Sequence, residues 1–367
     1  MMSCPILFFP YQLYPTLHKH SEAMTDREGI MAKKVLERKL WVAGGLAIEH
    51  GSQQATCDLF AMQDKNIEEA TRIIRDNELS VPLPDFLTAA DLSTTTKDRQ
   101  RRDPTRWAMT FKQWNTVVDE CKARDLFLEI KLNKAYDRFV SFYDINDYFV
   151  KPWTRGSGCS IALHMNPEGL EAEIMISHGW GEDVEQCQSA LKEAGICENA
   201  AVWFCTFAQY QPEDGKGPSV QAQLELAPFK CVIRSPEVHQ MVAVHTTKAD
   251  LYGRLWCVHE LDVALALGKE VIAAMSAEYR DQLVEQYMLV VDAGGGYTDA
   301  MEAAGLTVHT ARASCNAADK KMLIQQIFLQ EGGFDRIDKH VTNFRKEKVQ
   351  LVILQQLRDR AQKGELK

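Results

Sequence analysis

The strongest constraint on the fold is a series of short apolar runs in the second half of the chain. Helical segments lie between several of them, for example 183–194, which Gly195 closes, and 255–267, which ends before Gly268. Apolar runs of four to seven residues that alternate with helices are typical of parallel strands buried on both faces. We therefore predict an α/β fold with a doubly wound parallel sheet of about five strands over residues 168–315. The predicted strands are 172–177, 201–207, 241–244, 270–275 and 305–309.

Helices dominate the predictions for the rest of the chain. Residues 1–150 are expected to form a mostly helical region of unknown role, with amphipathic helices at 63–78 and 109–121. Residues 151–167 contain two prolines and two glycines, which favours a linker. Residues 316–367 are expected to form C-terminal helices.

Local features sharpen this outline. Thr110 followed by Gln113 has the spacing of a helix cap at the start of 109–121. The aromatic-rich segment 134–150 fits a buried helix or an interface, and a role in the core is the simpler interpretation. The segment 209–217, after the second predicted strand, is interpreted as a loop, and a pair of glycines at 332–333 is expected to break the tail helix.

Charge and cysteine usage exclude several classes of protein. Asp and Glu outnumber Lys and Arg by 51 to 42, so the net charge of −9 does not favour a nucleic-acid binder. No run approaches the roughly 18 apolar residues that span a bilayer, and the first residues lack a basic segment typical of a signal peptide. The ten cysteines contain no CxxC pair, which favours reduced thiols in the cytoplasm and no metal site.

Two segments stand at the expected carboxyl ends of the strands, where open parallel sheets bind ligands. The first is 174–183, with the sequence IMISHGWGED, and the second is 252–261, with the sequence YGRLWCVHEL. Together they resemble the TIR-domain superfamily, whose first strand ends in Ser plus an aromatic residue or His and whose third crossover helix begins Trp-Cys-x-x-Glu-Leu. The resemblance covers about 171–313, and it implies a flavodoxin-like sheet.

The resemblance also implies a function. Enzymatic TIR relatives are NAD glycohydrolases, and the Glu of the Trp-Cys-x-x-Glu pattern, Glu260 here, is their catalytic residue. Substrate binding is expected to involve Ser177, His178, Trp180 and Trp256. NAD is then the substrate, and no separate cofactor is required. In these relatives neighbouring domains complete each other's pocket, so self-association is expected as well.

Cleavage of the bond between nicotinamide and ribose requires few catalytic groups. Nicotinamide is a cationic leaving group that needs no general acid, and the transition state has oxocarbenium character. One carboxylate beside the ribose can stabilise the developing positive charge, as glycosidase carboxylates do. Water, or the adenine ring of the same molecule, can then attack to give a linear or cyclic product.

Alternatives stay open for single residues. Glu260 can instead be a solvated residue in the first turns of its helix. His178 can bind ligand or cap a strand end, and Trp180 can stack on a ring of the substrate or pack at a rim. Several enzymatic relatives carry an Arg near the nucleotide where this chain has Gly179 and Trp180. The resemblance therefore does not identify the residues that would bind the phosphates of NAD.

Two other functions are considered for the whole chain. The TIR fold also serves in non-catalytic signalling modules that act through self-association. The glycine-rich segment 290–299 has a superficial likeness to the phosphate loop of actin-like ATPases. The companion loops of that fold are not evident, so a flexible loop is the preferred interpretation of this segment.

Overall fold

The computed structural model describes residues 82–87, 92–133, 138–296, 298–300, 304 and 306–363. The predicted helix at 63–78 lies outside this range. The chain forms two compact units, the first from residues 1–81 and 122–139 and the second from residues 82–121 and 140–367. In the first unit, the described residues are 122–133, 138 and 139, and they include helix α7 (Asp125–Asn133). All sites considered below lie in the second unit.

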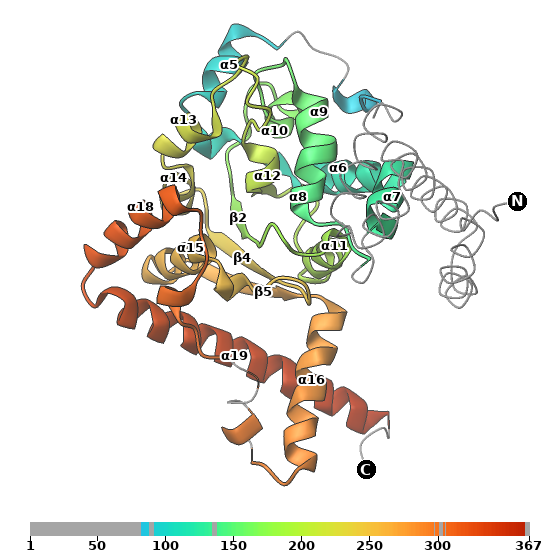
Figure 1. Ribbon diagram of the computed structural model, residues 1–367, viewed down its shortest axis with the longest axis vertical. Helices are drawn as coiled ribbons and strands as arrows, with labels where there is room; N and C mark the ends of the chain where they lie inside the picture. Colours follow the sequence, from blue (N-terminus) through green and yellow to red (C-terminus); the bar gives the residue numbers. More distant parts are fainter. Residues whose placement is uncertain are drawn as a thin grey trace, which may run out of the picture. The chain divides into compact units, whose positions relative to one another are not determined.

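The second unit contains a five-stranded sheet surrounded by helices (Figure 1). Its strands are β1 (Met109–Thr110), β2 (Ile174–Ser177), β3 (Ala201–Trp203), β4 (Gln240–His245) and β5 (Glu270–Met275). Its α-helices are α5 (Thr94–Gln100), α6 (Phe111–Ala123, which ends in the first unit), α8 (Phe142–Ile145), α9 (Lys151–Thr154), α10 (Ile161–Met165), α11 (Val184–Glu193), α12 (Cys205–Ala208), α13 (Val220–Glu225), α14 (Pro228–Arg234), α15 (Leu255–Ala266), α16 (Ala277–Asp292), α18 (Ala317–Phe328) and α19 (Gly333–Gln362). Shorter helical turns are η2 (Asp85–Leu87), η3 (Pro104–Arg106), the π-helical η4 (Asn146–Val150), η5 (Leu251–Gly253) and η6 (Thr310–Arg312).

The strand order β1-β3-β2-β4-β5 confirms an α/β fold with a mostly parallel sheet. Strands β3, β2, β4 and β5 run parallel, with Ile174 opposite Gln240 and Ser177 opposite Ala243. Strand β1 pairs antiparallel with β3 at the edge of the sheet. Every residue of β2 and β3 is buried, as expected for strands covered on both faces.

Two predicted strands need correction. The second strand ends at Trp203 rather than at 207, because the chain turns into α12 at Cys205 and buries Phe204 and Phe207 among other aromatic rings. The described residues 306–309 form no strand, and β1 supplies the fifth strand instead. The backbone N–H of Val308 donates to the Thr342 hydroxyl of α19. A side chain of a helix, rather than a neighbouring strand, thus accepts this backbone hydrogen bond.

Most of the predicted helix ends are confirmed. Asp183 caps α11 by accepting from the backbone N–H groups of Glu185 and Gln186, and Gly195 follows this helix with a φ of +73°. Gly268 follows α15 with a φ of +66°. At the start of α6, the Thr110 hydroxyl accepts from the Gln113 backbone while the Gln113 side chain accepts from the Thr110 backbone, which is the predicted capping box.

The helices cover both faces of the sheet. Helix α11 leads from β2 to β3 and packs on β4 and β5, while α15 leads from β4 to β5 and packs on β2, β4 and β5. The two connections leave the centre of the sheet in opposite directions, so right-handed crossovers place the helices on opposite faces. The chain therefore has a topological switch point between β2 and β4, where open α/β sheets bind ligands.

The segment 151–167 forms α9 and α10 rather than an extended linker. Ile161, Ala162 and Leu163 are fully buried in the second unit, so this segment is part of its core. In the predicted aromatic segment, Phe142 and Phe149 are likewise buried.

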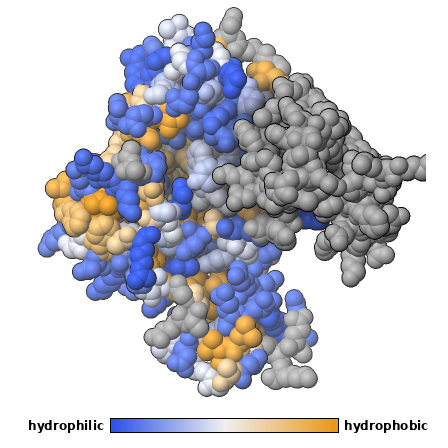
Figure 2. Space-filling model, viewed as in Figure 1, coloured by the Kyte–Doolittle hydropathy of each residue, from blue (hydrophilic) through white to orange (hydrophobic). Residues whose placement is uncertain are grey.

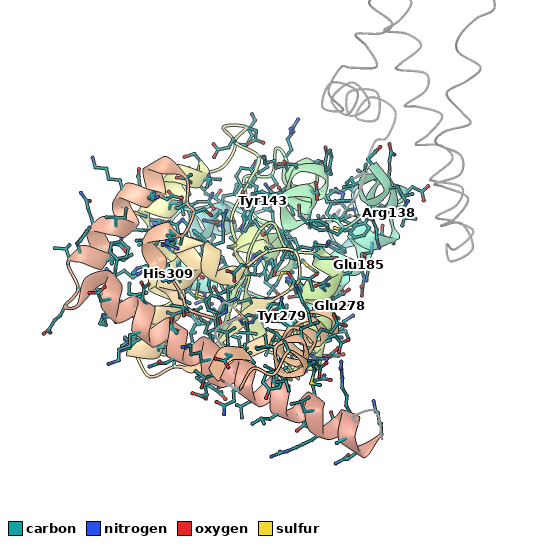
Figure 3. All side chains as sticks on the ribbon, turned by 60° about the horizontal axis from the view of Figure 1, so that its bottom comes forward. Arg138, Tyr143, Glu185, Glu278, Tyr279 and His309 are labelled. Carbon is teal, nitrogen blue, oxygen red and sulfur yellow. The ribbon has the colours of Figure 1, made fainter. Side chains whose placement is uncertain are left out.

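The tail forms two helices that Gly332 separates with a φ of +79°. Helix α19 packs along α15 and α16, as the side-chain view shows (Figure 3). The Arg336 guanidinium of α19 forms a bidentate ion pair, at 2.7 and 2.6 Å, with the fully buried Asp262 carboxylate of α15. Within the residues described, no helix is both long enough and apolar enough to cross a membrane.

Candidate functional site

The centre of the candidate site is a hydrogen bond between the two segments that the sequence singles out. The Ser177 hydroxyl, at the carboxyl end of β2, donates to Oε2 of Glu260 at 2.6 Å. Glu260 lies in α15, which follows β4, so the pair bridges the switch point of the sheet. Both residues are buried, with 1% of Ser177 and 4% of Glu260 exposed.

Burial dominates the ionisation of Glu260. Removal of the carboxyl group from water raises its pKa, while the bond from Ser177 and the nearby His178 lower it, and the result is a pKa of about 7. Near neutral pH the carboxyl group is therefore present in both its protonated and its ionised form. Glu260 is not a solvated residue of the helix surface.

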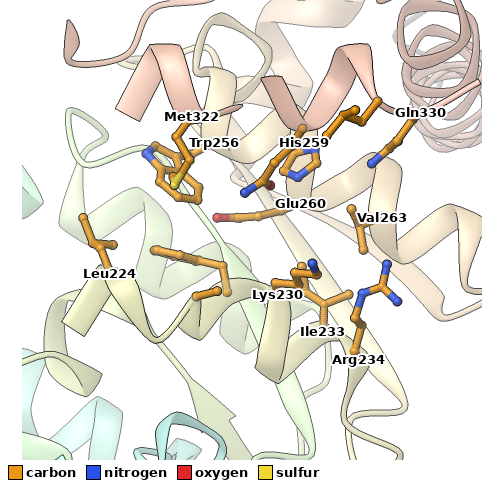
Figure 4. Close-up of a pocket in the computed structure, with 14 residues that line it drawn as sticks. Leu224, Lys230, Ile233, Arg234, Trp256, His259, Glu260, Val263, Met322 and Gln330 are labelled. Carbon is orange, nitrogen blue, oxygen red and sulfur yellow. The ribbon is translucent and has the colours of Figure 1, made fainter. Parts of the chain in front are cut away.

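Glu260 also lines a cavity of about 210 Å³ beside α14, α15 and α18 (Figure 4). The indole ring of Trp256 and the phenyl ring of Phe229 lie 4.8 Å apart between centroids, and both line it. The Trp256 Nε1–H donates to the Asp319 carboxylate of α18 at 3.0 Å, which fixes the indole ring. Met322 of α18 also lines the cavity, so the tail contributes one of its walls.

The polar side chains of the cavity include two exposed cations and a buried histidine. Lys230 and Arg234 of α14 line it and are exposed to solvent, and neither forms an ion pair with an acidic side chain of the described residues. His259 is buried, and burial lowers the pKa of its imidazole. Its Nδ1 atom has no hydrogen-bond partner within the described part of the chain.

Two of the five residues selected from the sequence line this cavity, and a third contacts one of them. Glu260 and Trp256 line it, and Ser177 binds Glu260. His178 and Trp180 do not line it, because their side chains converge on Cys205 instead. His178 Nε2 lies 3.2 Å from the Cys205 sulfur, and the Trp180 Nε1–H donates to the same sulfur at 3.1 Å.

The sequence interpretation missed several residues of this region. Cys205 lies two residues after β3 but inside the predicted strand 201–207, so the rule that ligand sites follow strands did not point to it. His259 stands inside the Trp-Cys-x-x-Glu pattern and was an available signal. Phe229 and Met322 had no such signal, because only the packing of α14 and α18 against α15 brings them to the cavity.

Comparisons with protein-family models, with curated proteins and with solved structures find no match to this chain. No group of three or more His, Cys, Asp or Glu side chains among the described residues is arranged to hold a metal ion. The function must therefore be argued from the chemistry of the site.

Proposed function

We propose that this chain is an NAD glycohydrolase that cleaves the bond between nicotinamide and ribose and releases nicotinamide and an ADP-ribose product. The observation that carries the proposal is the Glu260 carboxyl group. It is buried at the switch point of a parallel sheet, accepts a hydrogen bond from Ser177, and lines a cavity with aromatic walls.

Glu260 has the chemistry that this reaction needs. As nicotinamide leaves, positive charge develops on the ribose, and an ionised carboxylate that water does not screen stabilises this charge. A positively charged pyridinium ring also favours the ionised form of a neighbouring carboxyl group. Binding of NAD would thus lower the pKa of Glu260 and ionise the group when it is needed.

The surroundings of Glu260 fit the parts of NAD. A flat ring can stack on Trp256 or Phe229, and the exposed cations of Lys230 and Arg234 can bind the pyrophosphate. The cavity, at about 210 Å³, is smaller than pockets that enclose a whole drug-sized ligand. We therefore place nicotinamide and its ribose inside and the ADP moiety outside, along α14.

The order of the parallel strands supports the same proposal. The four parallel strands follow one another along the chain as β2, β3, β4 and β5. Across the sheet they lie in the order β3-β2-β4-β5, which is 2-1-3-4 when the parallel strands are numbered along the chain. These four strands have the same order as the first four strands of a flavodoxin-like sheet. The TIR-like motif residues Ser177 and Glu260 lie in contact at that sheet's ligand-binding edge.

The test is nicotinamide release from NAD by the purified full-length chain. We expect turnover by the wild type and a loss of at least about 100-fold in Glu260→Gln, because glutamine keeps the shape but not the charge. Glu285→Gln is the matched control, since Glu285 is exposed in the middle of α16. Equal turnover by wild type and Glu260→Gln would remove Glu260 from the reaction.

A second candidate function is supported by an exposed apolar surface on α18. Phe328 is 69% exposed and Leu329, directly after the helix, is 87% exposed, and apolar side chains appear there at the left of the space-filling view (Figure 2). Such a surface suits self-association, as in a non-catalytic assembly module. If no NAD is cleaved at any protein concentration while light scattering shows oligomers, the assembly function replaces the enzymatic one.

A further inference from the structure

The second cluster at the carboxyl edge of the sheet is a relay of side chains that ends on a sulfur atom. Glu182 Oε1 lies 3.0 Å from Nδ1 of His178, and Nε2 of His178 lies 3.2 Å from the sulfur of Cys205. The carboxyl group of Glu182 is in turn hydrogen-bonded to the Cys187 thiol. Glu182 and His178 are both buried, and the His178 ring stacks on Phe204 at 3.9 Å.

Hydrogen-bond roles follow from this geometry. Nδ1 of His178 is engaged by Glu182, so Nε2 is the ring nitrogen that faces the sulfur. The indole N–H of Trp180 can only donate, so at 3.1 Å it also directs a proton to the sulfur. The Cys205 sulfur thus accepts a hydrogen bond from Trp180 and faces Nε2 of His178, with which it can exchange a proton.

Electrostatics support the same assignment. Burial alone lowers the pKa of the His178 imidazole, but the Cys205 sulfur and the Glu182 carboxyl group outweigh burial and raise that pKa. Nε2 of His178 is therefore well suited to take the proton of the neighbouring thiol, as in cysteine nucleophiles paired with histidine.

Neighbouring side chains cover most of the Cys205 sulfur. Cys205 is 7% exposed, and Trp180 lies against its sulfur. The ring of Tyr143 lies 5.6 Å from that of Trp180 and is 44% exposed at the surface (Figure 3). A sulfur covered in this way excludes a peptide or an acyl substrate, so a small uncharged molecule is the reagent to test.

We propose that Cys205 is a peroxide-sensitive thiol: Nε2 of His178, which Glu182 holds in place, takes the thiol proton so that hydrogen peroxide can oxidise the sulfur. The sulfur attacks one peroxide oxygen, the S–O bond forms and the O–O bond breaks. The leaving hydroxide takes the Nε2 proton of His178 and departs as water. The sulfur is oxidised by two electrons to sulfenic acid, the peroxide is reduced, and the proposal does not depend on NAD cleavage.

The test compares cysteines within the native full-length chain. Reduced protein is exposed to hydrogen peroxide for graded times, sulfenic acid is trapped with dimedone, and each cysteine peptide is quantified by mass spectrometry. Cys197 and Cys231 are exposed and serve as internal references. Because Nε2 of His178 can take the thiol proton of Cys205, we expect Cys205 to react about 10-fold faster than either reference despite its burial.

Two comparisons separate activation from accessibility. In urea the His178 contact is lost, and the three cysteines are expected to react at similar rates. Glu182→Gln is expected to slow Cys205 toward the reference rate and to leave Cys197 unchanged. The proposal is wrong if native Cys205 reacts more slowly than Cys197 and Cys231, or if Cys205 still reacts faster than they do in urea. Both outcomes are measured on the wild type, so they do not depend on whether Glu182→Gln folds.

Discussion

Replacement of Glu260 by glutamine is expected to stabilise the protein, and to do so increasingly as the pH rises. The pKa of Glu260 is raised from 4.5 to about 7, mainly by burial. Between these values the unfolded chain has released its proton while the folded chain keeps it, so stability falls as the pH rises toward 7 and is constant above that. Glutamine does not titrate, and its side-chain oxygen can still accept the hydrogen bond from Ser177.

The two pKa values set the size of the effect. At pH 5 the ionisation of Glu260 costs roughly 1 kcal/mol of stability, and at pH 8 it costs about 3 kcal/mol. The advantage of Glu260→Gln over the wild type therefore grows by about 2 to 3 kcal/mol between these pH values.

Urea unfolding at pH 5, 6, 7 and 8, followed by tryptophan fluorescence, measures this difference. Six of the seven tryptophans belong to the second unit, and Trp107, Trp114 and Trp203 are buried there, so most of the signal reports on the unit that contains Glu260. The exposed control Glu285→Gln is expected to stay within about 0.5 kcal/mol of the wild type at every pH. A difference between Glu260→Gln and the wild type that does not change with pH would refute the assigned ionisation.

Two further predictions concern the neighbours of Glu260 and the attachment of the tail. Ser177→Ala removes a hydrogen bond that lowers the pKa of Glu260. Because the proposed cleavage of NAD requires the ionised carboxylate, the pH midpoint of the cleavage rate is expected to move upward when rates are measured from pH 5 to 9. An unchanged midpoint would contradict this assignment. Arg336→Leu leaves the buried Asp262 carboxylate without its main partner and is expected to destabilise the second unit by about 3 kcal/mol in urea unfolding. Arg358→Leu, at an exposed position of the same helix, is the control, and an equal loss in both variants would show that the ion pair contributes nothing specific.

The strand pattern predicted the central part of the fold and the main contact of the candidate site. Buried parallel strands have short apolar runs, and their ends lie at one edge of the sheet, so residues that follow different strands can meet there. This reasoning placed Ser177 and Glu260 close together although 83 residues separate them in the chain. The caps of α6 and α11 were predictable for a different reason, because capping depends on residues two or three positions apart.

Other features depend on contacts that no local pattern records. The apolar residues at 306–308 look like a strand, but a buried segment packed on helices needs the same side chains, and Thr342 satisfies its backbone. Phe229 and Met322 reach the cavity only through the packing of three helices. His178 was an expected ligand, yet its two ring nitrogens are occupied by Glu182 and Cys205, neither of which any motif connects to it.

The two buried carboxyl groups near this edge of the sheet have different partners, and the partners separate their roles. Glu182 is bound by His178 and by the Cys187 thiol, so its hydrogen bonds are directed to protein atoms and hold the imidazole in place. Glu260 accepts one hydrogen bond, from Ser177, and lines a cavity with space for a ligand. A glutamine at position 260 would also accept the hydrogen bond from Ser177, and it would not lower the stability of the fold through ionisation. A buried acid that lowers stability and faces a cavity is therefore better explained by binding or catalysis than by packing. His178 connects the two groups, because its charge lowers the pKa of Glu260. The imidazole that faces Cys205 therefore also favours the ionised form of Glu260, the form that the proposed cleavage of NAD requires.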